Sequence, residues 1–275
     1  PHALLDFRKF MADNDYQRRI LVTGEGDVPY NRQYLNTMPY LYYIKNLVFY
    51  TMGIPLALVS LFAFAFYPVK TVMDIIKKKA VDLSVLVPLA WLIPYFAIVG
   101  ASFGKFNRYM LPFTPFIIML AGKFLYDFAG WVREKKWAGA LKAATLAGAV
   151  FYGLAFMNVY TNSHTWIQAS RWIYKNIPET QFEGQQMRKT TILNEMWGDD
   201  LPVYADGKGS WVYNITKWNV QEPDSPQKLS ELSFRLNEAD YVAMADRRAY
   251  GTYLRLPKRY PLNYYYFSTM MKEPE

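Results

Sequence analysis

The sequence predicts a polytopic α-helical membrane protein with about four transmembrane helices and a C-terminal exoplasmic α/β domain. Residues 47–160 are apolar and carry their charges in short connectors, whereas residues 1–46 and 161–275 are polar, charged and rich in Tyr and Trp. Four segments of the apolar part approach the roughly 20 residues that a helix needs to cross a bilayer. The connectors between these segments are rich in Lys and Arg, which is typical of cytoplasmic loops.

The four predicted helices cover about 47–67, 84–103, 109–126 and 138–160. In the third, Lys123 lies near one end, where its long side chain can extend to the membrane surface. The fourth has a small-residue face from Gly139 to Gly148, which favours close helix packing. Prolines should kink the first three, which membrane helices tolerate. The alternative is four buried helices of a soluble protein, and four such runs in series, each bounded by charges, disfavour it.

The connectors predict the orientation of the chain. The first holds Lys70 and Lys77–Lys79, and the last holds Arg133, Lys135 and Lys136. Short basic loops stay cytoplasmic. We therefore expect a multi-pass protein of the cell membrane whose residues 1–46, 161–275 and middle hairpin are exoplasmic. The net charge of +8 is typical of nucleic-acid binding too. Because many of the charges lie beside apolar segments, we expect membrane lipid, and no nucleic acid, as a partner.

Composition also limits the chemistry. The chain has no cysteine, so it forms no disulfide and no Cys-ligated metal site. It has only two histidines, His2 and His164, which disfavours a His-based metal site or a catalytic triad. We expect no metal site.

The C-terminal part, 161–275, reads as a small α/β domain. A helix is predicted over 163–177, where Pro178 ends it, and a second over 225–238, with Ser225 as N-cap and Pro226 in the first turn. Strands are predicted over 190–196 and 241–245, in a βαβ-like order that favours a partly parallel sheet. Residues 205–226 are predicted to be loop. Because no Gly-rich phosphate loop follows either strand, nucleotide binding is not supported.

The hairpin between the second and third apolar segments contains the main candidate site. Lys105 and Arg108 stand three residues apart with no nearby acid, and Tyr109 and Pro112 follow. The anions native to a bilayer surface are lipid phosphates, so the two cations predict a phosphate clamp. The alternative is that they only anchor the hairpin at the membrane surface, with Tyr109 as an aromatic-belt residue.

Two groups of polar residues outside the hairpin are weaker candidates. Asp27, Tyr30 and Gln33 have carboxylate, hydroxyl and amide groups suited to recognising a sugar or an acceptor hydroxyl, although a Gly-Asp-x-Pro turn is the favoured interpretation. Asp199 and Asp200 are adjacent, and in a loop they could bind a divalent cation. Since no convincing set of further ligands lies nearby, a structural turn is favoured there as well.

Several motifs together resemble one protein family, the GT-C glycosyltransferases, and within it the prokaryotic protein O-mannosyltransferase and aminoarabinose transferase group. The hairpin resembles the family's late transmembrane hairpin through Lys105-x-x-Arg108-Tyr109-x-Leu111-Pro112-x-x-Pro115 and Ala121-Gly122. Two stretches resemble the family's exoplasmic loop before a transmembrane helix. They are Gly26-Asp27-Val28-Pro29-Tyr30-x-x-Gln33-Tyr34 and Thr37-x-Pro39-Tyr40. Three stretches resemble the family's soluble segment. They are Trp172-Ile173-x-x-Asn176-Ile177-Pro178, Glu195-x-Trp197-x-Asp199-Asp200-Leu201-Pro202, and Asp240-Tyr241-Val242 through Arg259-Tyr260-Pro261.

The resemblance implies transfer of a sugar from a polyprenyl-phosphate carrier to an acceptor on the exoplasmic face. In such enzymes the hairpin cations hold the carrier phosphate, which corresponds to Lys105 and Arg108. The family's catalytic carboxylate lies in an exoplasmic loop close to the N-terminus, and nothing corresponding precedes Pro1. The resemblance therefore implies the C-terminal portion of such an enzyme, whose partners would be the lipid-linked sugar and the N-terminal half or other membrane subunits.

Two other functions are weighed against this one. A non-catalytic membrane subunit could use the same scaffold to bind or brace a partner complex. A transporter is disfavoured because no charge is predicted in the middle of an apolar segment.

Overall fold

The computed structural model describes residues 2–196, 198, 200–245 and 247–272. The chain divides into two compact units, Pro1–Val159 and Tyr160–Glu275, which are described separately. This division lies one residue from the predicted boundary between 160 and 161.

The first unit is helical throughout its regular elements. Its α-helices are α1 (His2–Leu5), α2 (Phe7–Arg18), α3 (Leu41–Asn46), α4 (Ile54–Ile76), α5 (Leu83–Ala101), α6 (Thr114–Trp131) and α7 (Lys135–Met157). Short π-helical segments are η1 (Arg19–Thr23) and η3 (Leu47–Thr51), and short 3₁₀ segments are η2 (Pro29–Tyr34), η4 (Asn107–Met110) and η5 (Asn158–Thr161), the last at the boundary. Within the part of the chain that the structure describes, three helices are long and apolar enough to span a membrane, namely α4, α5 and one within Lys135–Asn176 that includes α7.

The predicted bounds of the first apolar helix, 47–67, were wrong. Residues 47–51 form η3, and α4 begins only at Ile54, because Gly53 adopts a φ of 75° and Pro55 occupies the first turn. The helix then continues to Ile76. Lys70 therefore lies inside α4, paired with Asp74 at 2.6 Å, and not in a connector as predicted.

The third apolar helix also differs from its predicted bounds of 109–126. Residues 107–110 form η4, and α6 begins at Thr114 with Pro115 in its first turn. α6 is not among the three membrane-length helices, and a fourth span stays a prediction. Lys123 does not extend freely to a surface. It pairs with Asp127 on its own helix and, at 3.1 Å, with Asp82, which caps the start of α5.

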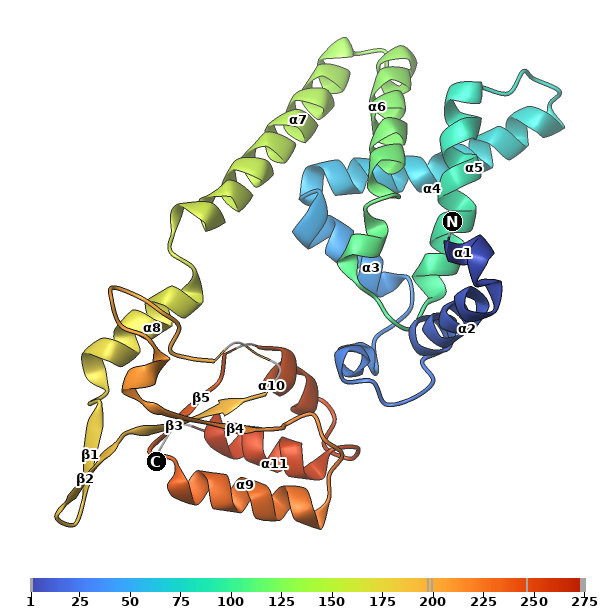
Figure 1. Ribbon diagram of the computed structural model, residues 1–275. Helices are drawn as coiled ribbons and strands as arrows, with labels where there is room; N and C mark the ends of the chain where they lie inside the picture. The colour runs from blue at the N-terminus through green and yellow to red at the C-terminus, as the bar shows by residue number, and fades with distance from the viewer. Residues whose placement is uncertain (1, 197, 199, 246, 273–275) are drawn as a thin grey trace. The chain divides into compact units, whose positions relative to one another are not determined.

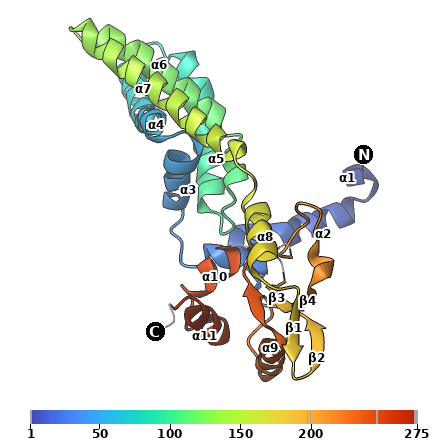
Figure 2. The same cartoon turned by 90° about the vertical axis from the view of Figure 1, so that its left-hand side faces the viewer.

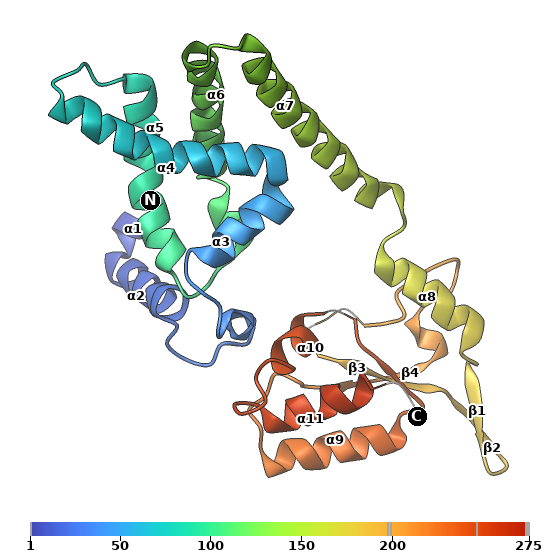
Figure 3. The same cartoon turned by 180° about the vertical axis from the view of Figure 1, so that it is seen from behind.

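The core of the first unit lies where α4 crosses α5 and α6, as Figures 1 and 3 show from opposite sides. Ala57, Leu92 and Ile117 are fully buried there. The predicted small-residue face of α7, from Gly139 to Gly148, approaches α4 only at its Gly148 end. A Cβ on Gly148 would come within 2.5 Å of Pro55 on α4, whereas a Cβ on Gly139 would meet open space. Small size matters at Gly148, where the two helices approach closely.

In its described residues, the second unit combines four α-helices and a short 3₁₀ segment with two small sheets. Its elements are α8 (Thr165–Asn176), β1 (Thr180–Glu183), β2 (Gln186–Lys189), β3 (Thr191–Glu195), η6 (Ser210–Val212), β4 (Asn214–Trp218), α9 (Pro226–Glu238), β5 (Tyr241–Ala243), α10 (Arg247–Tyr253) and α11 (Pro261–Met270). β1 and β2 form an antiparallel hairpin, and the other strands form a parallel sheet in the order β4-β3-β5. The predicted parallel pairing of the two strands is confirmed.

Helices cover both faces of the parallel sheet, whose central strand β3 is buried along its length (Figure 1). Ile192 packs with Ile173 and Ile177 of the α8 segment on one face. Side chains alternate along a strand, so Leu193 points to the other face, where α9 contacts β3 and β4. Ser225 caps α9 by accepting a hydrogen bond from the Lys228 backbone N–H at 3.1 Å, as predicted. The predicted loop 205–226 was wrong in part, because it contains β4.

Candidate functional site

The hairpin that carries the predicted cations connects α5 to α6 and is fastened to the N-terminal segment. The backbone N–H groups of Phe103 and Gly104 donate hydrogen bonds to the carbonyls of Val22 and Leu21, at 3.2 and 2.8 Å. The far side of the hairpin is held from α5, because the Tyr95 hydroxyl donates to the Tyr109 carbonyl. Residues about 80 positions apart in the chain are therefore joined by backbone hydrogen bonds into one loop assembly.

Lys105 is the most unusual residue of this assembly, because its side chain is a buried cation. The residue is only 2% exposed. Its ammonium donates to the carbonyl of Phe103 at 3.1 Å and lies 5.6 Å from the centre of the Phe103 ring. Among the described residues, no carboxylate forms an ion pair with it. Burial lowers the pKa of the Lys105 ammonium, as expected for a charge that has lost water without gaining a counter-ion.

Arg108 is exposed, and aromatic rings flank it. Its guanidinium carbon lies 4.7 Å from the centre of the Phe106 ring and 5.7 Å from that of Tyr109. Ring faces attract a guanidinium without neutralising its charge. No described acid pairs with Arg108. The arrangement orients the cation and leaves its N–H donors available to an anion.

Arg108 lines two clefts of the first unit. One has a volume of about 320 Å³ and is lined by Gln17, Leu21, Tyr30, Phe106, Arg108 and Tyr109. The other has a volume of about 360 Å³ and is mostly apolar, with a lining from Tyr50, Thr51, Asn107, Arg108, Met110, Leu111, Thr114, Tyr152, Gly153 and Phe156. The first cleft brings together three of the six predicted site residues, Tyr30, Arg108 and Tyr109.

The other three predicted residues have different surroundings. Asp27 makes a two-pronged ion pair with buried Arg32, and both of its contacts measure 2.8 Å. Gln33 donates from its side-chain amide to the Tyr30 carbonyl at 2.9 Å. Neither these two residues nor Lys105 lines the cleft of 320 Å³. Their role in recognising a sugar or an acceptor stays a prediction.

The sequence reasoning missed the residues that build the walls. Gln17 and Leu21 come from α2 and η1, which carry no motif. Phe106 stands between the two cations and could have been noticed for that reason, since an aromatic ring beside Arg is a common stacking partner. Asn31 was also missed. Its side-chain oxygen is buried without a hydrogen-bond donor, while its amide donates to the Ile20 carbonyl at 2.9 Å.

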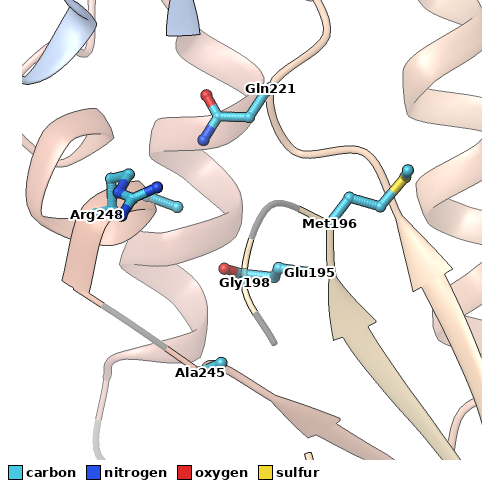
Figure 4. Close-up of a pocket in the computed structure, with 7 residues that line it drawn as sticks. Glu195, Met196, Gly198, Gln221, Ala245 and Arg248 are labelled. Carbon is cyan, nitrogen blue, oxygen red and sulfur yellow. The ribbon is translucent and has the colours of Figure 1, made fainter. Parts of the chain in front are cut away.

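The second unit has a cavity at the carboxyl ends of its three parallel strands, the edge at which open α/β sheets bind ligands. Figure 4 shows Glu195 and Met196 at the end of β3, with Gln221, Ala245 and Arg248 from the segments beyond β4 and β5. The cavity volume is about 10 Å³, which is room for about one water molecule. A sugar or a nucleotide does not fit it.

The adjacent acids Asp199 and Asp200 were weighed from the sequence as a cation site. Asp199 falls outside the described residues, and Asp200 pairs with Lys217 at 2.8 Å. Within the described residues, no group of three or more His, Cys, Asp or Glu side chains is arranged to hold a metal ion. Among the candidate binding sites of the described residues, we therefore take the cationic hairpin of the first unit, with Lys105 and Arg108, as the main one.

Comparisons of the chain with protein-family models, with curated proteins and with solved structures found no match in any of the three.

Proposed function

We propose that this chain is part of a membrane glycosyltransferase that moves a sugar from a polyprenyl-phosphate donor to an exoplasmic acceptor, and that the hairpin binds the donor phosphate. The observation that carries the proposal is the burial of Lys105 without an acidic partner among the described residues, three positions from an exposed Arg108 held by ring faces. A buried ammonium with one hydrogen-bond acceptor lacks a counter-ion, and a phosphate would supply it. The motif resemblance supports the same role.

The proposed reaction needs cations at the leaving group. The bond between the sugar's anomeric carbon and the phosphate oxygen breaks, and the phosphate keeps the electron pair. An acceptor oxygen bonds to the anomeric carbon, and its proton passes to a base. Lys105 and Arg108 would stabilise the charge that develops on the phosphate. The catalytic carboxylate is assigned to no residue of this chain.

The proposal includes a membrane location with four spanning helices and exoplasmic soluble parts. It is supported by the three membrane-length helices and by the exposure of α7. Leu146, Phe151 and Leu154 are 67–75% exposed on that helix. Water disfavours such a continuous apolar surface, whereas lipid tails accept it.

The test uses the chain in nanodiscs, with a radiolabelled polyprenyl phosphate as the probe and the matching polyprenol as the ligand without phosphate. We expect the chain to bind the phosphate and not the alcohol. Arg108→Ala should weaken binding at least 10-fold, and combining it with Lys105→Ala should abolish binding while the protein stays folded by circular dichroism. In the complete enzyme, the double variant should abolish sugar transfer.

Lys45→Ala is the matched control, because Lys45 is an exposed cation of the same unit outside the hairpin. It should bind the probe like the unaltered chain. Undiminished binding and transfer by the folded double variant would overturn the proposed function.

The alternative is a non-catalytic membrane subunit that binds or braces a partner complex. The exposed apolar face of α7 favours it, because helices of another protein could cover that face as well as lipid can. Transfer that needs Lys105 and Arg108 supports the enzyme. Unchanged transfer by the double variant, together with loss of a co-purifying membrane partner after Phe151→Ser, supports the subunit.

A further inference from the structure

Helices α1 and α2 carry an apolar face that nothing in the first unit covers. Leu4, Phe7, Phe10 and Met11 are 44–87% exposed, and no residue of α2 is buried. Phe7, Phe10 and Met11 are three and four residues apart and so lie on one side of α2, while Leu4 belongs to α1, across the break at Asp6. The rings of Phe7 and Phe10 lie 6.5 Å apart on that side.

The charges around this face match a phospholipid surface. Arg18 and Arg19 share Asp15, at 2.8 and 3.1 Å. At the other end of α2, Arg8 and Lys9 form no ion pair with any described acid. A second copy of the helix would cover the apolar face but bring the same cations, whereas a phospholipid supplies both hydrocarbon and phosphate.

The position of α2 is continuous with the proposed membrane surface. α2 runs on into η1, whose Leu21 and Val22 carbonyls accept hydrogen bonds from the residues just after α5. The 19 residues of α5 span about 28 Å at 1.5 Å each, close to the thickness of the hydrocarbon core. Figure 2 shows α2 leading sideways from the carboxyl end of α5, whereas Figure 1 shows α2 nearly end-on.

We propose that α2 is an interfacial helix, preceded by the short α1, whose apolar face lies in the lipid surface and whose carboxyl end forms one wall of the 320 Å³ cleft. Gln17 of α2 and Leu21 of η1 line that cleft beside Arg108. Contact with the membrane surface thus positions part of the candidate phosphate site. The inference rests on the membrane location given under the proposed function.

Site-directed spin labelling tests this directly, because the chain has no cysteine to remove. Single variants Phe7→Cys, Asp13→Cys and Val87→Cys carry a nitroxide in phospholipid nanodiscs holding one copy each. Val87 is an exposed residue of α5 and reports the spanning helix. We expect oxygen, which concentrates in lipid, to relax the labels at 87 and 7. A water-soluble nickel complex should relax the label at 13.

The outcomes separate this inference from the proposed function. If the label at 7 is as accessible to nickel as the label at 13, while the label at 87 stays in lipid, the interfacial helix is wrong and the membrane location stands. A water-accessible label at 87 would overturn the membrane location itself. Spin–spin broadening at position 7 that appears only with two copies per disc, with no lipid contact in single-copy discs, would assign the face to a second copy and also overturn the inference.

A binding measurement tests the link to the cleft. Phe7→Ser with Phe10→Ser should weaken binding of a polyprenyl phosphate about 10-fold, because the helix end that carries Gln17 loses its support. Ala12→Ser, at an exposed position on the opposite side of α2, is the matched control and should leave binding unchanged. Equal binding by both variants would contradict a positioning role for the helix.

Discussion

Lys105 is a buried side chain whose burial lowers the pKa of its ammonium. Its ammonium has lost nearly all contact with water and has gained one carbonyl and one ring face. A bound phosphate would be a counter-ion for the buried ammonium and would offset the free energy lost by removing it from water. If the proposed site binds phosphate, Lys105 would affect both the stability of the protein without ligand and the affinity for the ligand.

Replacing Lys105 with Met should stabilise the empty protein. Burial lowers the pKa of Lys105 below its ordinary value of 10.5, so between the lowered value and 10.5 the unfolded chain binds more protons. Stability should rise with pH through that window, and the burial penalty is fully present below it. Lys105→Met should raise the free energy of unfolding at pH 7 by about 1 kcal/mol and remove the alkaline rise.

Denaturant unfolding in detergent at pH 7 and pH 10 measures both effects. Lys45→Met, an exposed cation, should change neither value. A loss of stability in Lys105→Met at pH 7 would show that the buried ammonium is a structural partner and not a site awaiting an anion.

Asp240 gives a pH dependence of the opposite sign in the second unit. Its carboxylate accepts hydrogen bonds from Arg188 at 2.7 and 2.8 Å and from the Thr191 backbone N–H at 2.8 Å. The bond from Arg188 lowers the pKa of Asp240 below its ordinary 3.8. The stability it contributes is present above pH 3.8 and is lost as the pH falls through the lowered value.

Asp240→Asn should therefore cost about 1–2 kcal/mol at pH 7, and the difference from the unaltered protein should shrink in acid. Thermal unfolding of the second unit between pH 7 and pH 2 measures it. Asp206→Asn is the control, because its pair with Arg171 is exposed to water and should contribute much less to stability than the pair of Asp240 with Arg188. A cost for Asp240→Asn that does not change with pH would rule out the carboxylate as its source.

At the residue scale, spacing predicted the cations of the hairpin but not their surroundings. Arg108 and Tyr109 follow one another, so their shared cleft was within reach of sequence reasoning. The hydrogen bonds of Phe103 and Gly104 with Val22 and Leu21 join segments about 80 residues apart, which no local pattern identifies. The ion pair of Asp27 with Arg32 was missed because a five-residue separation in a loop has no regular geometry.

Among the helices, α7 meets α4 through a glycine. A Cβ on Gly148 would lie 2.5 Å from the Pro55 ring, while a Cβ on Gly153, five residues along the same helix, would meet nothing within 4 Å. Gly148→Ala should destabilise the first unit by about 1–3 kcal/mol through overpacking. Gly153→Ala should stabilise it by about 0.5–1 kcal/mol, because alanine favours the helix.

Thermal unfolding of the two variants in detergent measures the contrast. Equal shifts in the same direction would mean that α7 does not pack against Pro55. Because the two substitutions are chemically identical, differences in helix propensity cannot account for opposite signs.

Elements with a strong local signal were predicted, and elements that depend on tertiary pairing were missed. The cap at Ser225 and Pro226 located the start of α9 to the residue. β4 has alternating but weakly apolar residues, and it becomes a strand because β3 pairs with it in register. The apolar run from Leu47 predicted one long helix, but Gly53 breaks it, since its φ of 75° does not fit a helix.

For the molecule as a whole, the division at Val159 and Tyr160 predicts two units that unfold separately. Residues 158–164 are exposed, which suits a linker. A specific protease site inserted between Val159 and Tyr160 should be cut readily. The released second unit should melt at the same temperature as in the uncut chain.

The control is the same protease site inserted between Gly122 and Lys123, inside α6, where a protease cuts only after local unfolding. Calorimetry of the cut and uncut protein compares the melting temperatures. Cleavage at the linker that unfolds the second unit would show that it depends on the first.

The pairing of residues 21–22 with residues 103–104 also determines when the candidate site can exist. The first partner leaves the ribosome about 80 residues before the second, and two apolar helices are made in the interval. Until α5 is complete, the N-terminal segment has no hairpin to bond to, and Lys105 has no enclosure. The proposed phosphate site can therefore be completed only after α4 and α5 have both been made, and a chain in which α5 fails to fold would not complete it.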